Sequence, residues 1–287
     1  MEYELPNYSM TWDGATEQEI KGDAPVANDL TAKVLSAMNP APSIDAYPDT
    51  YVHLPAGYIF QSEVVQDAEV RELTGADEEA LEKARVGGNP AKYINTLLQC
   101  GVVSVGSHTA TQSILDELVQ GDLDALLMGV RRATFGDDFE VFGVVCESCG
   151  ESNDLSLNLK DIPVKELDDP SVRDFLVPLR KGRSARVQFP TGAVQTEIFK
   201  KNRTITEMNN LTLAACILAF VEADGSETPC NGINAVKKMG VSDRKTIQMF
   251  IYDNQPGPRY DQVVAQCHAC EGEVPVPLSV GVLFREL

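Results

Sequence analysis

Two Cys-x-x-Cys pairs, separated by more than a hundred residues, constrain the fold of this chain more than any other feature. The first pair is Cys146 and Cys149, and the second is Cys267 and Cys270. A Cys-x-x-Cys on a tight turn directs both sulfurs to one point, and two such turns supply the four thiolates of a tetrahedral zinc site. The sequence therefore predicts that distant parts of the chain fold together around one metal ion.

The cysteine count and the start of the chain bear on what these pairs can do. There are seven cysteines in 287 residues, so they cannot all pair as disulfides. The first residues, Met1 to Pro6, lack the basic and then apolar pattern of a secretory signal, and we expect a reducing, cytosolic setting. In that setting paired cysteines are more often metal ligands or redox centres than structural disulfides.

Metal binding and redox chemistry both stay open for the two pairs, and we favour a metal. A redox Cys-x-x-Cys usually opens a helix, whereas Cys149 is followed by a turn and an alternating strand, 155–159. A glycine after each pair, Gly150 or Gly272, is expected to let the backbone fold over the sulfurs. Four thiolates suit zinc or iron. We predict one structural, tetrahedral Zn²⁺ ion held by Cys146, Cys149, Cys267 and Cys270.

The three other cysteines are not needed for this site. Cys100 and Cys216 lie in apolar helical segments and are expected in the core, because free cysteine behaves as a small buried hydrophobe. Cys230 has no assigned role, and together with His268 it is a spare ligand candidate.

The sequence from Val52 onward contains the same pattern twice. Segments 52–57 and 187–192 each resemble a strand start closed by a Pro-x-Gly turn. Asp122 and Asp243 are expected to cap helices, and each lies 24 positions before the first cysteine of a pair. Matches of this kind without a gap favour an internal duplication.

We therefore predict an α+β fold made of two related units, each with helices and a small sheet, joined by a zinc-ribbon-like four-cysteine site. The expected organisation is an extended N-terminal arm at 1–48, a first unit at 49–165 ending in the Cys146/Cys149 knuckle, a linker at 166–186, and a second unit at 187–287 ending in the Cys267/Cys270 knuckle.

Charge and hydropathy exclude several partners. The 24 basic and 43 acidic residues give a net charge of −19, which argues against binding to a phosphate backbone, so no nucleic acid is expected. The longest apolar stretch, 211–221, is too short to span a bilayer and predicts a buried helix, so no membrane is expected. A basic cluster at 180–186 is the local exception, and it is either a solvated linker or a docking patch for an acidic surface of a partner.

No sequence motif indicates catalysis. The chain lacks a phosphate-binding loop, a dinucleotide fingerprint, a nucleophile elbow and a histidine-rich metal motif. We therefore predict no catalytic residue, no cofactor-binding residue and no small-molecule substrate, and we expect that the protein is not an enzyme.

The order of several short motifs resembles the baseplate hub and tail assembly proteins of contractile-tailed bacteriophages. The resemblance covers 52–150 well and 187–272 as a degenerate second copy. The motifs that carry it are 54–57, 74–79, 121–127, 131–136 and 146–150.

The resemblance implies a non-enzymatic structural protein of the virion tail baseplate, hub or wedge-proximal, made in the host bacterial cytoplasm. Its partners would be other phage tail and baseplate proteins. Three alternatives stay open: an assembly factor that the virion does not retain, a zinc-ribbon module that binds nucleic acid, and a dithiol oxidoreductase.

Overall fold

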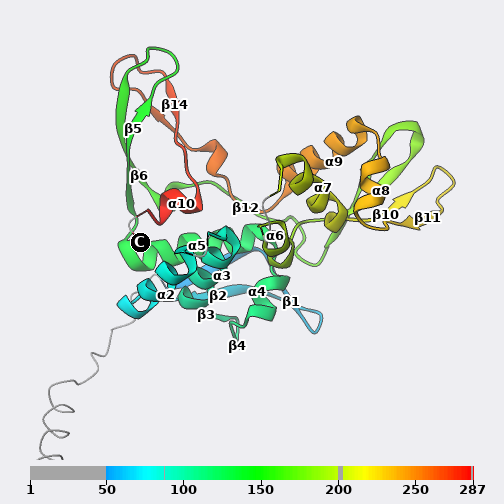
Figure 1. Cartoon of the computed structure of the whole chain (residues 1–287), viewed down its shortest axis with the longest axis horizontal. Coiled ribbons are helices and arrows are strands. Elements are labelled where there is room, and N and C mark those ends of the chain that lie inside the picture. Colours follow the sequence, from blue (N-terminus) through cyan, green and yellow to red (C-terminus); the bar gives the residue numbers. More distant parts are fainter. Residues whose placement is uncertain (1–49, 87, 200–202, 286) are drawn as a thin grey trace, which may run out of the picture. The chain divides into compact units, whose positions relative to one another are not determined.

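The first half of the chain forms a four-stranded antiparallel sheet with two pairs of helices. The computed structural model describes residues 50–86, 88–199, 203–285 and 287 (Figure 1), so the predicted arm, 1–48, lies outside the described residues. The strands are ordered β1-β2-β3-β4, with bounds β1 Tyr51–Phe60, β2 Glu63–Val70, β3 Val102–Val105 and β4 His108–Thr109. The helices are α2 Gly75–Val86 and α3 Pro90–Gly101, between β2 and β3, and α4 Gln112–Glu117 and α5 Gln120–Phe135, after β4.

Side-chain caps explain where the first helices begin. The amide and the hydroxyl of Thr74 donate to the Asp77 carboxylate at 2.8 and 2.7 Å, so an acid in the first turn of α2 holds the residue before it. Asn89 caps α3 by accepting the amide of Ala91, and Pro90 follows at the first helical position. Helices α2 and α3 therefore both begin where a side chain satisfies free backbone amides or fixes the residue before the first turn.

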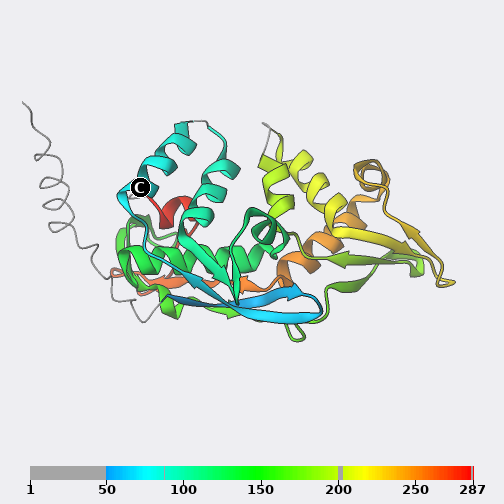
Figure 2. The ribbon, with the colours of Figure 1, turned by 90° about the horizontal axis from the view of Figure 1, so that it is seen from below.

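Helix α5 packs against β1 and β2, and Figure 2 shows it in green beside the blue strands. The expectation that Asp122 caps this helix is wrong, because α5 begins at Gln120 after Val119. Asp122 is fully buried, and its Oδ1 accepts the amide of Ala56 in β1 at 2.8 Å. The carboxylate therefore ties the helix to the sheet instead of closing the helix end.

A second four-stranded antiparallel sheet carries the same order of elements. The order is β11-β10-β9-β8, with bounds β8 Asp174–Pro178, β9 Ser184–Gln188, β10 Ile217–Val221 and β11 Glu227–Pro229. Helices α6 Gly192–Phe199 and α7 Ile205–Cys216 lie between β9 and β10, and α8 Ile233–Lys238 and α9 Val241–Asn254 follow β11. In each half, the chain thus runs through two strands, two helices, two more strands and two more helices.

This order changes which segments correspond. Segment 52–57 belongs to β1, whereas 187–192 ends β9 and begins α6, so the two segments hold different places and their predicted match is wrong. The expected linker, 166–186, contains β8, which pairs with β9 from Asp174↔Gln188 to Pro178↔Ser184. The stretch is therefore part of the second sheet, while the predicted domain boundaries stay predictions.

Asp243 and the apolar stretch 211–221 also differ from expectation. Asp243 is the third residue of α9 and does not cap it; its Oδ1 accepts the amide of Arg180, just after β8, at 3.3 Å. The stretch 211–221 is not one helix, because α7 ends at Cys216 and β10 begins at Ile217. Within the part of the chain that is described, no helix is long and apolar enough to cross a membrane.

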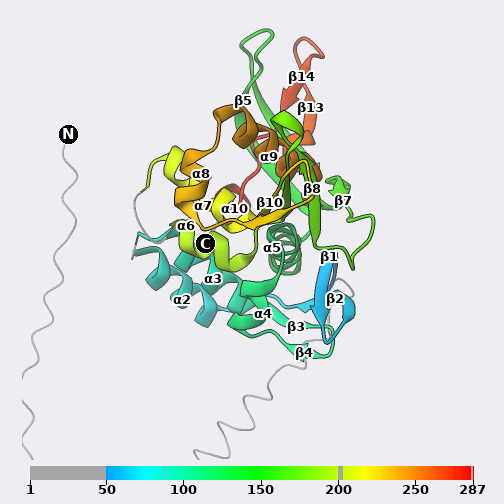
Figure 3. The same cartoon turned by 90° about the vertical axis from the view of Figure 1, so that its right-hand side faces the viewer.

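Two β-hairpins hold the cysteine pairs. Strands β5 Asp138–Val145 and β6 Ser152–Asn158 form the first hairpin, and β13 Val264–Gln266 and β14 Glu273–Pro275 form the second. The hairpins lie side by side in Figures 1 and 3. The remaining elements are short: β7 Val164–Lys165 paired with β12 Gly257–Pro258, helix α10 Val280–Leu283, and 3₁₀ turns at Leu159–Asp161, Arg180–Gly182 and Tyr260–Gln262.

Two hydrophobic cores follow the two sheets. The second core is formed mostly by the second sheet and its helices. Its last buried residue is Ile251, so the described residues after α9 add nothing to it. The first core contains the first sheet and also both hairpins, including Phe139, Leu155, Cys146, Cys267 and Val274. The end of the chain therefore returns from the second sheet to the first core.

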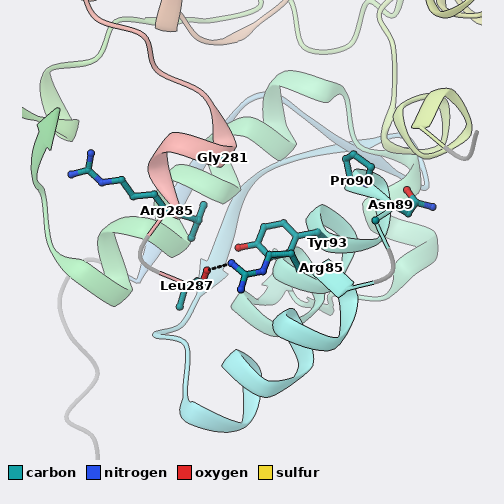
Figure 4. Close-up of a pocket in the computed structure, with 9 residues that line it drawn as sticks. Arg85, Asn89, Pro90, Tyr93, Gly281, Arg285 and Leu287 are labelled. Atoms are coloured by element: carbon teal, nitrogen blue, oxygen red, sulfur yellow. Dashed lines mark hydrogen bonds between the residues drawn. The ribbon is translucent and has the colours of Figure 1, made fainter. Parts of the chain in front are cut away.

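Helix α10 completes this return by packing against α5. Arg85 Nη1, at the end of α2, donates to the Leu287 carbonyl at 3.2 Å, as Figure 4 shows. A surface cavity of about 360 Å³ separates α10 from the α2–α3 corner, with Tyr93 and Phe284 in its lining.

Candidate metal centre

The four predicted cysteines converge at the tips of the two hairpins. Their Sγ atoms all lie within 4.8 Å of one another. The Sγ atoms of Cys146 and Cys270 are 3.7 Å apart, and those of Cys149 and Cys267 are 3.6 Å apart. An ion with metal–sulfur bonds of about 2.3 Å in a tetrahedron places its sulfurs about 3.8 Å apart. Two of the sulfur–sulfur separations match this value, the others stay within 4.8 Å, and none of the four cysteines forms a disulfide, so the cluster is compatible with a tetrahedral metal.

The two pairs are arranged alike. Cys146 and Cys267, the first cysteines, are buried, while Cys149 and Cys270, the second, are exposed. Each buried sulfur faces the exposed sulfur of the other pair. The cluster thus has an approximate local two-fold arrangement.

Identical backbone hydrogen bonds close the two turns. In the first, the Cys146 amide donates to the Glu151 carbonyl and the Gly150 amide donates to the Cys146 carbonyl, both at 2.8 Å. In the second, Cys267 bonds Gly272 and Glu271 bonds Cys267 in the same directions, both at 2.9 Å. Each turn is anchored by its first cysteine, which fixes where the sulfurs point.

Backbone amides inside each turn favour thiolate at the buried cysteines. The amides of Cys149 and Ser148 lower the pKa of Cys146, and those of Ala269 and Cys270 lower the pKa of Cys267 to about 6. Hydrogen bonds from backbone amides stabilise the charged sulfur more than the neutral thiol, so both buried positions are prepared to act as ligands.

The sulfurs also act on one another. The Glu151 amide lowers the pKa of Cys149, but the neighbouring sulfurs of Cys270, Cys267 and Cys146, together with partial desolvation, outweigh it and raise that pKa to about 12. Four sulfurs this close cannot all be anionic without a cation between them. The arrangement is one that a divalent metal stabilises by displacing the remaining protons.

The two glycines after the pairs have different tasks. Gly150 adopts a φ of +75°, the left-handed region that favours glycine. In the second turn this conformation falls on Glu271, with a φ of +58°, and not on Gly272 as expected. A Cβ on Gly272 would lie 3.2 Å from Cys270 Sγ and 3.4 Å from Ser148 Oγ. A side chain at Gly272 would thus push the Cys270 sulfur out of place, so glycine here accommodates the close approach of the two turns.

Asn153 in β6 connects the two hairpins, and the motif search missed it. Its Oδ1 accepts the amide and the ring Nδ1 of His268 at 3.0 and 2.8 Å, and its Nδ2 donates to the Glu151 carbonyl at 3.0 Å. Asn153 is 1% exposed. The alternation of β6 could have revealed it, because it places Asn153 on the same inward side as Leu155.

The other predicted candidates lie away from the cluster. Cys216 is buried in the second core, and Cys100 packs against the first core, as expected. Cys230 packs against the second core, and His268 is held by Asn153, so neither spare candidate joins the four sulfurs. Within the described ranges, no second group of three or more His, Cys, Asp or Glu side chains has metal-binding geometry.

Comparison with known proteins agrees with the sequence resemblance. A family model described as T4 bacteriophage base plate protein matches residues 56–271, about three quarters of the chain. The chain belongs to this family of phage baseplate proteins. No curated protein and no solved structure matches the chain.

Proposed function

We propose that this phage baseplate protein is a structural, non-enzymatic subunit, hub or wedge-proximal, that joins other tail and baseplate proteins during assembly. The family match carries this proposal, because it begins in β1, spans both sheets and ends one residue after Cys270. The matched region thus contains both cysteine pairs and both sheets except for the first residues of β1.

The metal in this proposal is one zinc ion held by Cys146, Cys149, Cys267 and Cys270. Four sulfur ligands fill a tetrahedral site and leave no position for a substrate, so the ion would stabilise the fold and perform no chemistry. The support is the spacing of the sulfurs and the amides that favour thiolate at the buried pair. Iron suits the same donors, and the metal content decides between them.

Two features favour this role over the redox and nucleic-acid alternatives. Each cysteine pair lies on the turn of a hairpin and not at the start of a helix, where redox Cys-x-x-Cys motifs are usually found. The net charge of −19 opposes binding to a phosphate backbone.

The repeated order of elements supports an internal duplication. In each sheet the third residue of the last helix is a buried aspartate, Asp122 or Asp243, that accepts an amide from the first strand or the residues just after it, Ala56 or Arg180. A shared polar contact inside two otherwise different cores favours common descent of the two halves.

Mass spectrometry of purified virions and isolated tails tests the structural role. We expect the protein at a fixed ratio to known baseplate components. Its presence in assembly intermediates but absence from finished tails would reject the permanent role and leave an assembly factor.

A further inference from the structure

Charge is distributed very unevenly along this acidic chain. Residues 50–173 carry 22 acidic and 9 basic side chains, a net charge of −13. Residues 174–254, which form the second sheet and its helices, carry 8 acidic and 11 basic side chains, a net charge of +3. The second sheet and its helices are therefore the positive part of a protein whose net charge is −19.

The fold gathers many of these cations where the β8–β9 turn meets helix α9. Asp243 makes this junction, since its carboxylate accepts the Arg180 amide at 3.3 Å and pairs with Arg183 at 3.5 Å. The end of α8 lies three residues before α9 and adds two lysines. We define the basic patch as Arg180, Lys181, Arg183, Lys237, Lys238, Arg244 and Lys245.

Little within the protein neutralises the basic patch. Asp243 is buried and already bonded to the turn. The Glu207 carboxylate on α7 accepts from Thr204 and lies near Arg203 as well as Lys237. Among the described residues, Lys181 and Lys245 form no ion pair, and both are exposed. Exposed cations without partners can pair with acidic groups of another molecule without first breaking internal bonds.

An apolar side chain lies among the cations. Val241, the first residue of α9, is 77% exposed and lies between Lys238 and Arg244 in the sequence. Protein contacts commonly combine an apolar centre with a charged rim, whereas a phosphate backbone offers nothing to an exposed valine.

Among the described residues, the corresponding junction of the first sheet does not carry these cations. Asp122, the counterpart of Asp243, is followed by Leu123 and Asp124, whereas Asp243 is followed by Arg244 and Lys245. Asp122 accepts a hydrogen bond from the amide of Ala56, whereas Asp243 accepts one from the amide of Arg180. The cations are thus a feature of one half and are not required by the shared architecture.

We propose that the basic patch docks an acidic segment of another protein, with Val241 against an apolar side chain of that segment. The inference rests on the proposed role as a subunit that joins other proteins, and it names the surface and the chemistry of the contact. A duplex is disfavoured because residues 50–173 of the same compact unit would repel an extended row of phosphates.

Fluorescence anisotropy with the full chain tests the proposal. The probes are a labelled 14-residue peptide rich in Asp and Glu with a central Leu, the same peptide with Asn and Gln, and a labelled duplex of 20 base pairs. We expect the acidic peptide to bind, the amide peptide to bind at least tenfold more weakly, and added salt to weaken the acidic complex.

Two double variants with equal charge changes supply the control. Lys181→Glu with Lys245→Glu should weaken acidic-peptide binding at least tenfold, whereas Lys83→Glu with Lys92→Glu, exposed on α2 and α3, should change it less than twofold. Circular dichroism and zinc content check that both variants are folded. Equal weakening by the two pairs, or tighter binding of the duplex than of the acidic peptide, overturns the proposal.

Assembly separates this proposal from the proposed function. If Lys181→Glu with Lys245→Glu enters tails as well as the wild-type chain does, the docking surface is wrong and the baseplate role stands. If the wild-type chain is missing from tails but still binds the acidic peptide in the expected way, the baseplate role is wrong and the surface stands.

Discussion

The side-chain oxygen of Asn153 accepts two hydrogen bonds from His268, one from its backbone amide and one from its ring Nδ1. The two residues belong to different hairpins, so this contact holds the second cysteine turn against the first strand pair. The Asn153 side chain is buried, so its polar atoms depend on these partners and not on water.

Replacing Asn153 with alanine should loosen the metal centre without removing a ligand. The change leaves the His268 amide and ring without their shared acceptor, whereas the Glu151 carbonyl keeps the Cys146 amide, so the expected cost is about 1–2 kcal/mol. Urea unfolding should show this loss, and a chelator should remove zinc faster than from the wild-type chain. Ser156→Ala, at an exposed position on the same strand, is the control and should change neither property.

The two turns should respond in opposite ways to glycine changes. Gly150→Ala places a Cβ in the left-handed region and should destabilise by about 1 kcal/mol, while Glu271→Gly relieves the same conformation and should stabilise by a similar or smaller amount. Nothing lies within 4 Å of a Cβ built at Gly150, so packing does not explain the loss.

Thermal unfolding with metal bound measures both changes. Gly75→Ala, in the first turn of α2 with ordinary φ and open space, is the control and should be neutral or stabilising. A loss of stability in Glu271→Gly would contradict the assignment of strain to that residue.

Removing the metal should destabilise the packing of the C-terminal hairpin and α10 against the first core. Cys146→Ser should reduce zinc from near one equivalent to near zero, whereas Cys230→Ser should retain it, because only Cys146 belongs to the cluster. A clasp between residues 146 and 267 closes a loop of 121 residues, for which chain entropy alone contributes about 5 kcal/mol.

Elemental analysis and melting under reducing conditions test this pair. A chelator should lower the melting temperature of the wild-type chain to that of Cys146→Ser and leave the variant unchanged. A full equivalent of zinc in Cys146→Ser would rule out the proposed ligand set.

Asp122 should make stability depend on pH in a defined window. Burial, opposed by the amides of Ala56 and Gly57, raises the pKa of Asp122 to about 6. Between about pH 4 and pH 6 the native state keeps a proton that the unfolded state has lost, so stability falls as the pH rises. Asp122→Asn removes this titration.

The free-energy difference between the two chains isolates this effect from other carboxylates. From pH 4 to pH 7 it should shift in favour of Asp122→Asn by about 2–3 kcal/mol, since two pKa units correspond to about 2.7 kcal/mol. Urea unfolding of both chains at matched pH values gives the difference. A pH-independent difference would mean that Asp122 titrates near its ordinary value.

The sequence was informative where a residue type carries its own chemistry. The spacing of the cysteines predicted which four sulfurs meet. Asp122 and Asp243 could not be interpreted correctly, because a carboxylate that caps a helix and one that accepts an amide from another element look alike in sequence.

The boundaries of some helices and strands could not be predicted from local sequence patterns either. Strand β8 is short, lies at the edge of its sheet and ends in Pro178, so its pattern resembled a linker. The stretch 211–221 is apolar throughout, and only pairing of β10 with β9 and β11 shows that half of it is strand. The role of Asn153 could not be predicted because its partner, His268, lies more than a hundred positions away in the sequence.

The placement of the four cysteines has a consequence for biosynthesis. The first two donors leave the ribosome long before the last two, and in between the second sheet and its helices are translated. A nascent chain that stops before residue 270 lacks at least one of the four donors. A complete four-cysteine site could therefore form only after both halves have been translated. Truncated chains would lack this site and its stabilising effect.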